Sequence, residues 1–244
     1  MIARGLRGPG PGSSINPLLV IGLLLLLFAF ISRTLVSPVQ RAADDPIGFV
    51  GFVIAILLGI TVHEFMHAYT ATRLGDDTAR LLGRLSLNPM AHLDPFGTLL
   101  IVLAGFGYGK PVPFNESRLR SALGVSAVAL AGPLANLVLA FVCAIPLRFG
   151  DAEMLDGAYG VVLESIVYYN CVLAIFNLVP IPPLDGSNVV YGLLPPQQKF
   201  TWRSYQQYGP MILLALLFFG AQFLRVIVFA PALFLFRLFT GLNF

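Results

Sequence analysis

Long runs without a charged residue are the feature that most constrains this chain, because no soluble core could hide so much apolar surface. Helix-length uncharged runs cover residues 8–32, 46–62, 121–147, 165–184 and 204–224. About 20 residues of helix cross a bilayer, so four or five of these runs are candidate spans. Hydrophobic residues make up 57% of the chain and charged residues only 11%, against roughly 25% charged residues in an ordinary soluble domain. The sequence therefore predicts an all-α polytopic membrane protein.

Two further apolar segments are harder to assign. Residues 95–109 are short for a span and rich in glycine, which favours a re-entrant or interfacial piece lining a cavity. The tail 226–244 is either a last short span or an interfacial helix. We expect about five or six transmembrane helices in one domain, 1–244, with a core at 46–192 and accessory helices at 8–36 and 204–240. A signal peptide is the alternative for the first run, but no clear small-residue cleavage site follows it.

The leucines at 81, 82, 85 and 87 lie among turn signals, and they predict a short strand or hairpin after the second span. An exposed strand edge there would hold a substrate peptide in extended form by main-chain pairing.

The distribution of charge predicts the orientation in the membrane. Connections 73–120 and 185–203 carry most of the basic residues outside the N-terminal segment, whereas the connection near 148–156 is acidic. Short cytoplasmic loops collect lysine and arginine, so both basic connections are expected on the cytoplasmic side. We expect a cell membrane, of a prokaryote, with the functional site towards the cytoplasm.

One short motif carries chemistry. His63, Glu64 and His67 form His-Glu-x-x-His at the end of the run 46–62. On a helix, residues four apart project from one face, so both imidazoles can bind one metal ion. Glu64 is then free beside the metal and can take a proton from a zinc-activated water. The alternative is that these polar side chains only hydrogen-bond one another inside the membrane.

A zinc ion with two histidine ligands needs a third protein ligand and an open position. Asp185 ends a helix-length uncharged run on the side where His67 is expected, at the right depth for that role. The prolines before it break the helix, which membrane proteins tolerate where the backbone lines a site. The alternative is a plain turn residue before Gly186. We expect one Zn²⁺ ion bound by His63, His67 and Asp185.

These motifs together resemble a known family. The second motif is Asn177-x-x-Pro180-x-Pro182-x-Leu184-Asp185-Gly186. Three more lie between the two, namely Asn88-Pro89-x-x-His92-x-Asp94-Pro95-x-Gly97-Thr98, Gly109-Lys110-Pro111-Val112-Pro113 and Gly132-Pro133-x-x-Asn136. The pattern is similar to the site-2 protease family of intramembrane zinc metalloproteases, in its compact branch without PDZ or nucleotide-sensing domains.

The resemblance implies a hydrolase that cleaves transmembrane segments of membrane proteins with a zinc-activated water, in regulated intramembrane proteolysis. Glu64 would be the general base, and Asn177 would contact the substrate or the developing oxyanion. A helix-end hydrogen bond near Pro180 is the alternative for Asn177. His92 is expected either to stabilise the transition state or to make a structural hydrogen bond. Asn136 is expected either to contact substrate or to pack helices together.

Two other functions are weighed against the protease. A metal transporter would usually show internal repeats or several charged groups along one path, which this chain lacks. A catalytically idle zinc-binding scaffold would not need Glu64. The expected partners are a transmembrane protein substrate and the lipid bilayer, with no nucleic acid. A regulatory membrane partner and a homo-oligomer both stay open.

Overall fold

Helices make up the regular structure of residues 42–95, 97–98 and 109–242, which are the residues described in this computed structural model. The longer helices are α2 (Pro46–Arg73), α5 (Gly124–Phe149), α7 (Ala158–Asn177), α8 (Asp185–Leu193), α9 (Pro196–Gln206), α10 (Gly209–Phe219) and α12 (Ala230–Thr240). The short pieces are α3 (Thr78–Leu81), η1 (Pro89–Ala91), η2 (Glu116–Arg118), α6 (Ala152–Leu155), α11 (Ala221–Leu224) and the π-turn η3 (Arg225–Phe229). Among the described residues there is no strand, only an isolated antiparallel bridge between Leu93 and Gly109.

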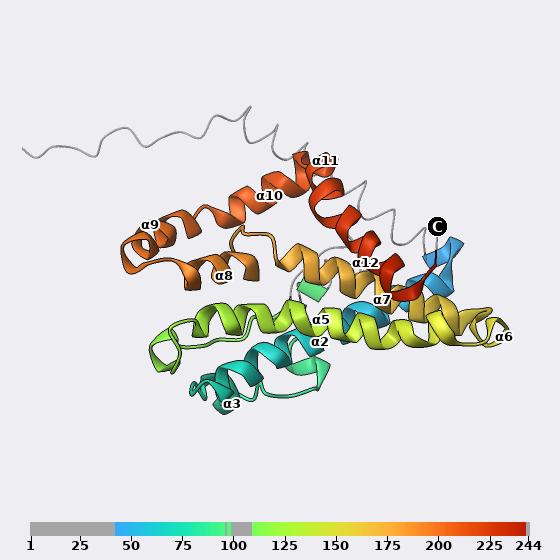
Figure 1. The fold of residues 1–244 in the computed structure, drawn as a ribbon, viewed down its shortest axis with the longest axis horizontal. Helices are drawn as coiled ribbons and strands as arrows, with labels where there is room; N and C mark the ends of the chain where they lie inside the picture. Colours follow the sequence, from blue (N-terminus) through green and yellow to red (C-terminus); the bar gives the residue numbers. More distant parts are fainter. Residues whose placement is uncertain (1–41, 96, 99–108, 243–244) are drawn as a thin grey trace, which may run out of the picture.

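Four described segments are long and apolar enough to cross a membrane: α2, α5, α7 and the continuous stretch from α11 to α12, Ala221–Thr240. Helices α2, α5 and α7 run side by side, and α12 lies across α5 and α7 (Figure 1). The prediction of a polytopic helical membrane protein is confirmed. The predicted first span, 8–36, and most of the predicted re-entrant piece, 95–109, lie outside the described residues.

The predicted span at 204–224 is wrong. That stretch is divided among α9, α10 and α11, and α10 has only 11 residues. A helix of that length reaches about 16 Å, roughly half of the hydrocarbon core. The chain breaks before Gly209–Pro210 and again at Gly220, so the span lies further on, at Ala221–Thr240.

The predicted strand through Leu81 and Leu87 is also wrong. Leu81 ends helix α3, and Gly83 follows with a positive φ of 71°, a conformation that interrupts an extended strand. Leu81, Leu82 and Leu87 are 75%, 62% and 61% exposed, so these side chains are not the buried face of a sheet. Later in the connection, residues 110–115 have no regular secondary structure, and the prolines at 111 and 113 favour extended backbone at the residues that precede them.

Small residues bring α2 and α7 into close contact. Gly51, Ala55 and Gly59 are buried at four-residue spacing on one face of α2. A Cβ atom added at Gly51 would lie 2.6 Å from Ser165 Oγ, and one at Gly59 would lie 2.8 Å from Asn170 Oδ1. Small-residue faces of this kind let membrane helices approach closely, so backbone carbonyls of α2 lie within reach of α7 side chains.

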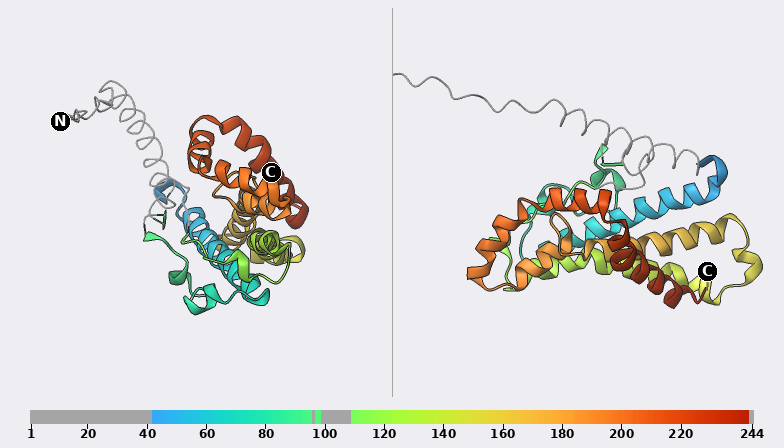
Figure 2. Two further views of the ribbon diagram at one scale, coloured as in Figure 1. Left: turned by 90° about the vertical axis from the view of Figure 1, so that its left-hand side faces the viewer. Right: turned by 90° about the horizontal axis from the view of Figure 1, so that it is seen from above.

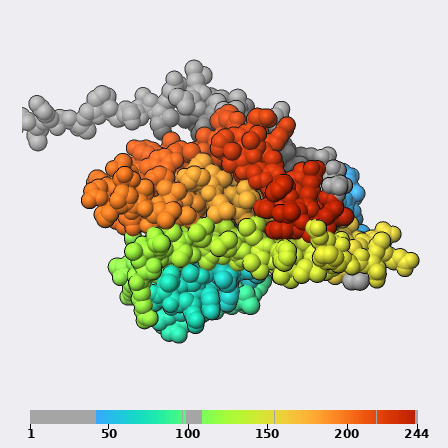
Figure 3. Space-filling view, viewed as in Figure 1, coloured from blue at the N-terminus to red at the C-terminus, as the bar shows by residue number. Residues whose placement is uncertain are grey.

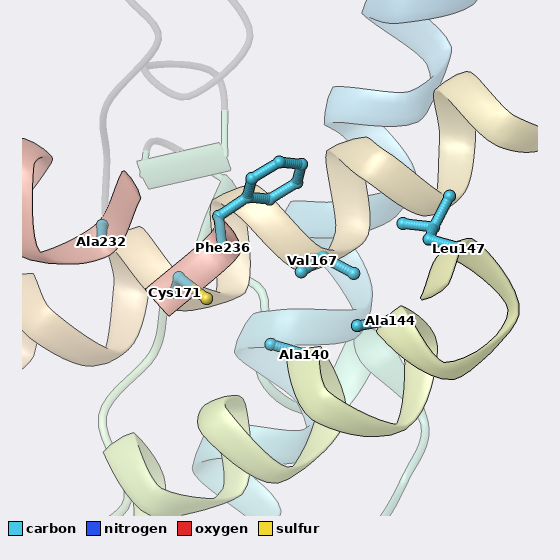
Figure 4. Packing of buried hydrophobic residues seen from close by; sticks show 7 residues of the cluster. All are labelled: Ala140, Ala144, Leu147, Val167, Cys171, Ala232 and Phe236. Carbon is cyan, nitrogen blue, oxygen red and sulfur yellow. The ribbon is translucent and has the colours of Figure 1, made fainter. Parts of the chain in front are cut away.

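The apolar core joins α5, α7 and α12. Figure 4 shows Ala140 and Ala144 on α5 facing Val167 and Cys171 on α7, with Phe236 of α12 against them. Phe236 is only 1% exposed. This packing holds α5 beside α7, which matters for the site because both helices also pack against α2.

Helices α8, α9 and α10 form an arm at one end of the bundle (Figure 2). In the space-filling view α5 lies between this arm and the segment of α2 and α3 (Figure 3). Ser126 Oγ donates to the carbonyl of Val189 at 2.8 Å, and a Cβ at Gly192 would meet Ser126, so α8 sits tightly on α5.

A charged cluster joins the two basic connections at this end of the bundle. Glu116 accepts hydrogen bonds from Tyr191 and Arg203, each at 3.0 Å, and its carboxylate lies 3.5 Å from Lys199 Nζ. Arg120 N donates to the carbonyl of Leu74 just after α2. The two basic connections therefore lie at one end of the bundle, as the charge pattern predicts.

We predict that Gly51→Leu destabilises the bundle, since its side chain would enter the space of Ser165. Overpacking of this kind costs about 1–3 kcal/mol. Thermal unfolding in detergent, followed by circular dichroism, measures the effect. Leu58→Ala is the control, because Leu58 lies on the same helix and is 41% exposed. Equal melting temperatures for the two variants would contradict the close contact.

Candidate metal centre

Three side chains from two distant segments converge on one point. His63 Nε2 lies 3.0 Å from His67 Nε2 and 2.9 Å from Asp185 Oδ2, and His67 Nε2 lies 3.2 Å from the same oxygen. The histidines come from consecutive turns of α2, and Asp185 is the first residue of α8. Both histidines are 7% exposed. The predicted ligand set is thus brought together, and its members could hold a metal ion.

The other ring nitrogen of each histidine is occupied by an acceptor. His63 Nδ1 lies 2.6 Å from Asn136 Oδ1, and His67 Nδ1 lies 2.7 Å from the carbonyl of Val128. A carbonyl only accepts, so each Nδ1 carries a proton and donates it. A neutral imidazole protonated at Nδ1 has its lone pair on Nε2. Both lone pairs therefore belong to the nitrogens that face Asp185.

The donor set fits zinc. Two imidazoles and a carboxylate, with an open position, make up a common catalytic zinc site. For zinc bonds of about 2.0–2.1 Å, tetrahedral ligands lie about 3.3–3.4 Å apart. The distances of 2.9–3.2 Å between these donor atoms are close to that spacing.

Gly132 leaves room for this arrangement. A Cβ atom at Gly132 of α5 would lie 2.4 Å from His67 Nε2 and 2.7 Å from His63 Nε2. Those are the two nitrogens that would bind the metal, so any side chain at this position would fill the place next to them. The glycine is required by this close approach.

The turn before α8 fixes Asp185. The carbonyl of Leu178 would lie 2.2 Å from a Cβ at Gly186, so the start of α8 packs directly against the end of α7. Ser187 N donates to the carbonyl of Leu184 across the same turn. Pro182–Pro183 is a cis peptide within it. The carboxylate also lies at the first turn of a helix, where negative charge is favourable.

Glu64 lies beside the three donors without joining them. Its Oε2 accepts a hydrogen bond from Val112 N at 3.2 Å. Val112 stands between Pro111 and Pro113, which have no N–H, so it supplies the only main-chain donor of that tripeptide. With this one donor among the described residues, the Glu64 carboxylate retains lone pairs with which to accept a proton.

Comparison with known proteins identifies the family. The model of "Peptidase family M50" matches residues 51–152 and 146–220. The chain belongs to peptidase family M50. The resemblance to site-2 proteases is confirmed, and the chain is a metallopeptidase.

Curated relatives agree with this family. The chain is 42% identical over 176 residues to "Putative zinc metalloprotease YwhC" of Bacillus subtilis, covering 67% of this chain and 78% of the relative. It is 33% identical to "Putative zinc metalloprotease Rip2" of Mycolicibacterium smegmatis, covering 72% of each. It is 23% identical to "Zinc metalloprotease MJ0392" of Methanocaldococcus jannaschii, covering 75% of this chain and 46% of that relative. No solved structure matches the chain.

The three remaining predicted site residues of this M50 peptidase lie in different environments. Asn177 ends α7, and its Nδ2 donates to the carbonyl of Leu173 at 3.0 Å, which is the helix-end hydrogen bond weighed as the alternative. His92 is fully buried, and its Nε2 bonds the carbonyl of Ser86 at 2.6 Å, within its own loop. Their roles on substrate stay predictions.

Asn136 is buried among helices α2, α5 and α7, whereas contact with substrate would require an accessible side chain. It is 0% exposed, and its amide bonds His63, the carbonyl of Gly59 and Asn170. These contacts favour packing and support of a ligand over contact with substrate. Sequence reasoning missed Asn170 and the carbonyl of Val128. Asn170 could have been found in the sequence, because it is a polar residue inside an apolar helix. The carbonyl of Val128 leaves no mark in the sequence, since every residue has a backbone carbonyl.

Asp76 anchors the connection that carries Val112. It is 0% exposed, and it accepts hydrogen bonds from Asn115 N and from Thr78 N and Oγ1, with Arg118 3.9 Å away. Burial opposes ionisation, but these donors and the arginine outweigh it and hold the pKa of Asp76 below its usual value. Asn115, whose N–H bonds Asp76, lies three residues after Val112, so Asp76 holds the far end of the segment that contacts Glu64.

We predict that Gly132→Val abolishes metal binding, because its side chain would occupy the space beside both Nε2 atoms. Metal content of the purified protein, determined by mass spectrometry, measures the loss. Leu134→Ala is the control, since Leu134 lies on the same helix and is 53% exposed. Full metal content in Gly132→Val would contradict the assigned centre.

We predict a pH dependence from Asp76. A carboxyl group with a lowered pKa in the folded state stabilises the protein fully above its unfolded pKa, near 3.8, and loses that contribution as pH falls through the folded value. Asp76→Asn should therefore lower the melting temperature at pH 7, and the gap to the unchanged protein should narrow below pH 4. Thermal unfolding at the two pH values measures it. A gap of constant size would show that ionised Asp76 is not the anchor.

Proposed function

We propose that this M50 peptidase is a zinc-dependent intramembrane endopeptidase that cleaves membrane proteins in or near their transmembrane segments. One zinc ion would be bound by His63, His67 and Asp185, with Glu64 as the general base. Regulated intramembrane proteolysis is the process we assign to it. The names of the curated relatives support zinc as the metal.

The position of the three donor atoms along the membrane-spanning helix carries the proposal. His63 lies 17 residues after Pro46 in the 28-residue helix α2. At about 1.5 Å per residue this is about 26 Å along the helix, and about 15 Å before its end at Arg73. Both histidines are buried between α2, α5 and α8. Hydrolysis at this depth suits a substrate whose scissile peptide bond lies in or near the membrane.

The residues divide the chemistry between them. When bound, zinc supplies a Lewis acid that activates water and polarises the scissile carbonyl. Glu64 takes the proton of the attacking water and delivers it to the leaving amine. Val112 N–H orients the Glu64 carboxylate through Oε2. Asn136 and the Val128 carbonyl hold the histidine rings. Asn177 is proposed to assist at the substrate carbonyl, which would need its amide to leave the Leu173 carbonyl.

The substrate must be extended for cleavage, whereas a transmembrane segment is helical. The segment 110–115 contacts Glu64 through Val112 N and Asp76 through Asn115 N. We propose that the peptide is unwound beside this segment rather than beside the leucines of residues 81–87.

The orientation follows from charge. Arg118, Arg120, Lys199 and Arg203 lie at one end of the bundle, tied together through Glu116, Asp76 and Leu74. By the positive-inside rule we propose that this end faces the cytoplasm, with the metal centre towards that side of a cell membrane. We propose that cleavage is regulated by a partner protein or by prior trimming of the substrate.

We predict that Glu64→Gln retains zinc and loses at least about 100-fold in cleavage rate, because the amide cannot accept the proton of the attacking water. The assay is cleavage of a transmembrane peptide in detergent or liposomes, with and without chelator, alongside zinc content. Glu153→Gln at the opposite end of the bundle is the control and should cleave normally.

The same assay separates the alternatives. A metal transporter or an idle scaffold would bind zinc equally with or without the Glu64 carboxylate and would show no chelator-sensitive cleavage. Unchanged cleavage in Glu64→Gln would remove Glu64 from the chemistry.

A further inference from the structure

We propose that Asn170 is a positioning residue for the metal centre. Acting through Asn136, it fixes the His63 tautomer that presents a bare Nε2 to the metal. The inference rests on the proposed role of His63 as a ligand. Asn170 itself touches neither histidine.

Asn170 lies in the middle of α7 and is 0% exposed. Its Nδ2 donates to the carbonyl of Ile166 at 2.8 Å and is 3.5 Å from the carbonyl of Ala55 on α2. Both acceptors belong to the backbone, and a backbone carbonyl cannot donate. The amide of Asn170 is therefore held with its nitrogen towards these carbonyls, which turns Oδ1 towards α5.

The next link is Asn136. Its Nδ2 donates both hydrogens, one to Asn170 Oδ1 at 2.8 Å and one to the carbonyl of Gly59 at 3.0 Å. With both hydrogens used on that side, Oδ1 faces His63 Nδ1 at 2.6 Å. An amide oxygen only accepts, so the proton of the ring sits on Nδ1. The lone pair is then on Nε2, 2.9 Å from Asp185 Oδ2.

His67 shows why His63 needs this support. The Nδ1 of His67 bonds the Val128 carbonyl, a backbone group that cannot exchange donor for acceptor. The acceptor for His63 is a side-chain amide, whose oxygen and nitrogen exchange places by a half-turn. If both asparagines turned over, Asn136 Nδ2 would donate to His63 Nδ1, and the ring proton would move to Nε2, where the metal must bind.

The backbone decides between the two arrangements. In the reversed chain the carbonyls of Ile166 and Gly59 would each face an amide oxygen instead of a donor. Unpaired or repelling polar groups are costly where no water can replace the lost bond. The series of hydrogen bonds that starts at the carbonyl of Ile166 and runs through Asn170 and Asn136 thus determines which nitrogen of His63 has a free lone pair.

The first test is zinc affinity of the full-length protein in detergent, measured by competition with a chelating dye. Asn170→Leu removes one of the two acceptors of the Asn136 amide and leaves a buried N–H unpaired, so the affinity should fall about 10- to 100-fold, the usual effect of losing support behind a ligand. Ser165→Ala, which removes an intrahelical hydrogen bond on the same helix, is the control and should bind zinc normally. Equal affinities in the two variants would overturn the proposal.

A double variant distinguishes positioning from packing. Asn136→Asp places a carboxyl group there, which when protonated donates its single O–H to the Gly59 carbonyl and still accepts from His63 Nδ1, so it should bind zinc without help from Asn170. Asn136→Asp combined with Asn170→Leu should therefore bind zinc more tightly than Asn170→Leu alone. A double variant that binds no better than Asn170→Leu would show that Asn170 acts through packing only.

The tautomer itself can be observed without any substitution. The chain has three histidines, so ¹⁵N-labelled imidazoles give few NMR signals in metal-free protein, and a His63→Gln sample assigns those of His63. We expect a protonated Nδ1 and a bare Nε2 on His63. A proton on Nε2 would overturn the inference even if Asn170→Leu failed to fold.

These readouts separate this inference from the proposed function. Loss of peptide cleavage in every assay, with normal zinc affinity and the expected tautomer, would contradict the protease and leave the role of Asn170 standing. Normal cleavage with the proton of His63 on Nε2 would contradict the role of Asn170 and leave the protease standing.

Discussion

Two imidazoles can direct their Nε2 lone pairs at one point inside a membrane bundle only if something else accepts both of their Nδ1 protons. In this protein the acceptors are a backbone carbonyl of α5 and the amide of Asn136, also on α5. Helices α2, α5 and α7 approach one another closely because Gly51, Ala55, Gly59 and Gly132 carry little or no side chain. The candidate metal centre therefore depends on the helix packing.

Local spacing made half of the site predictable. His63, Glu64 and His67 lie within one and a half turns, so the helix alone puts both histidines on one face. Asp185 could be predicted because its run ends on the side where α2 ends, and because prolines before it mark a broken helix. The supporting groups were out of reach, since the contact between Asn170 and Asn136 joins residues 34 positions apart on different helices. A carbonyl such as that of Val128 has no side chain to recognise.

The errors also have physical causes. Residues 204–224 are uncharged, yet Gly209, Pro210 and Gly220 divide them into helices too short to cross a bilayer, and hydropathy alone does not register these breaks. The leucines at 81, 82 and 87 suggested a strand by composition, but a strand needs a partner and a buried face, and these side chains are largely exposed. The charge pattern correctly grouped the two basic connections at one end of the bundle, because the two ends of a span are separated by the full thickness of the membrane.

The order of the segments along the chain has a consequence for biosynthesis. Helix α2 enters the membrane with its two histidines before α5 supplies their acceptors, and Asp185 follows only after α7 is complete. A nascent chain thus carries the His-Glu-x-x-His helix without a third ligand and without fixed ring orientations. The three candidate ligands are all present only once α8 has been made, so a chain that ends before α8 cannot hold the metal with the complete set.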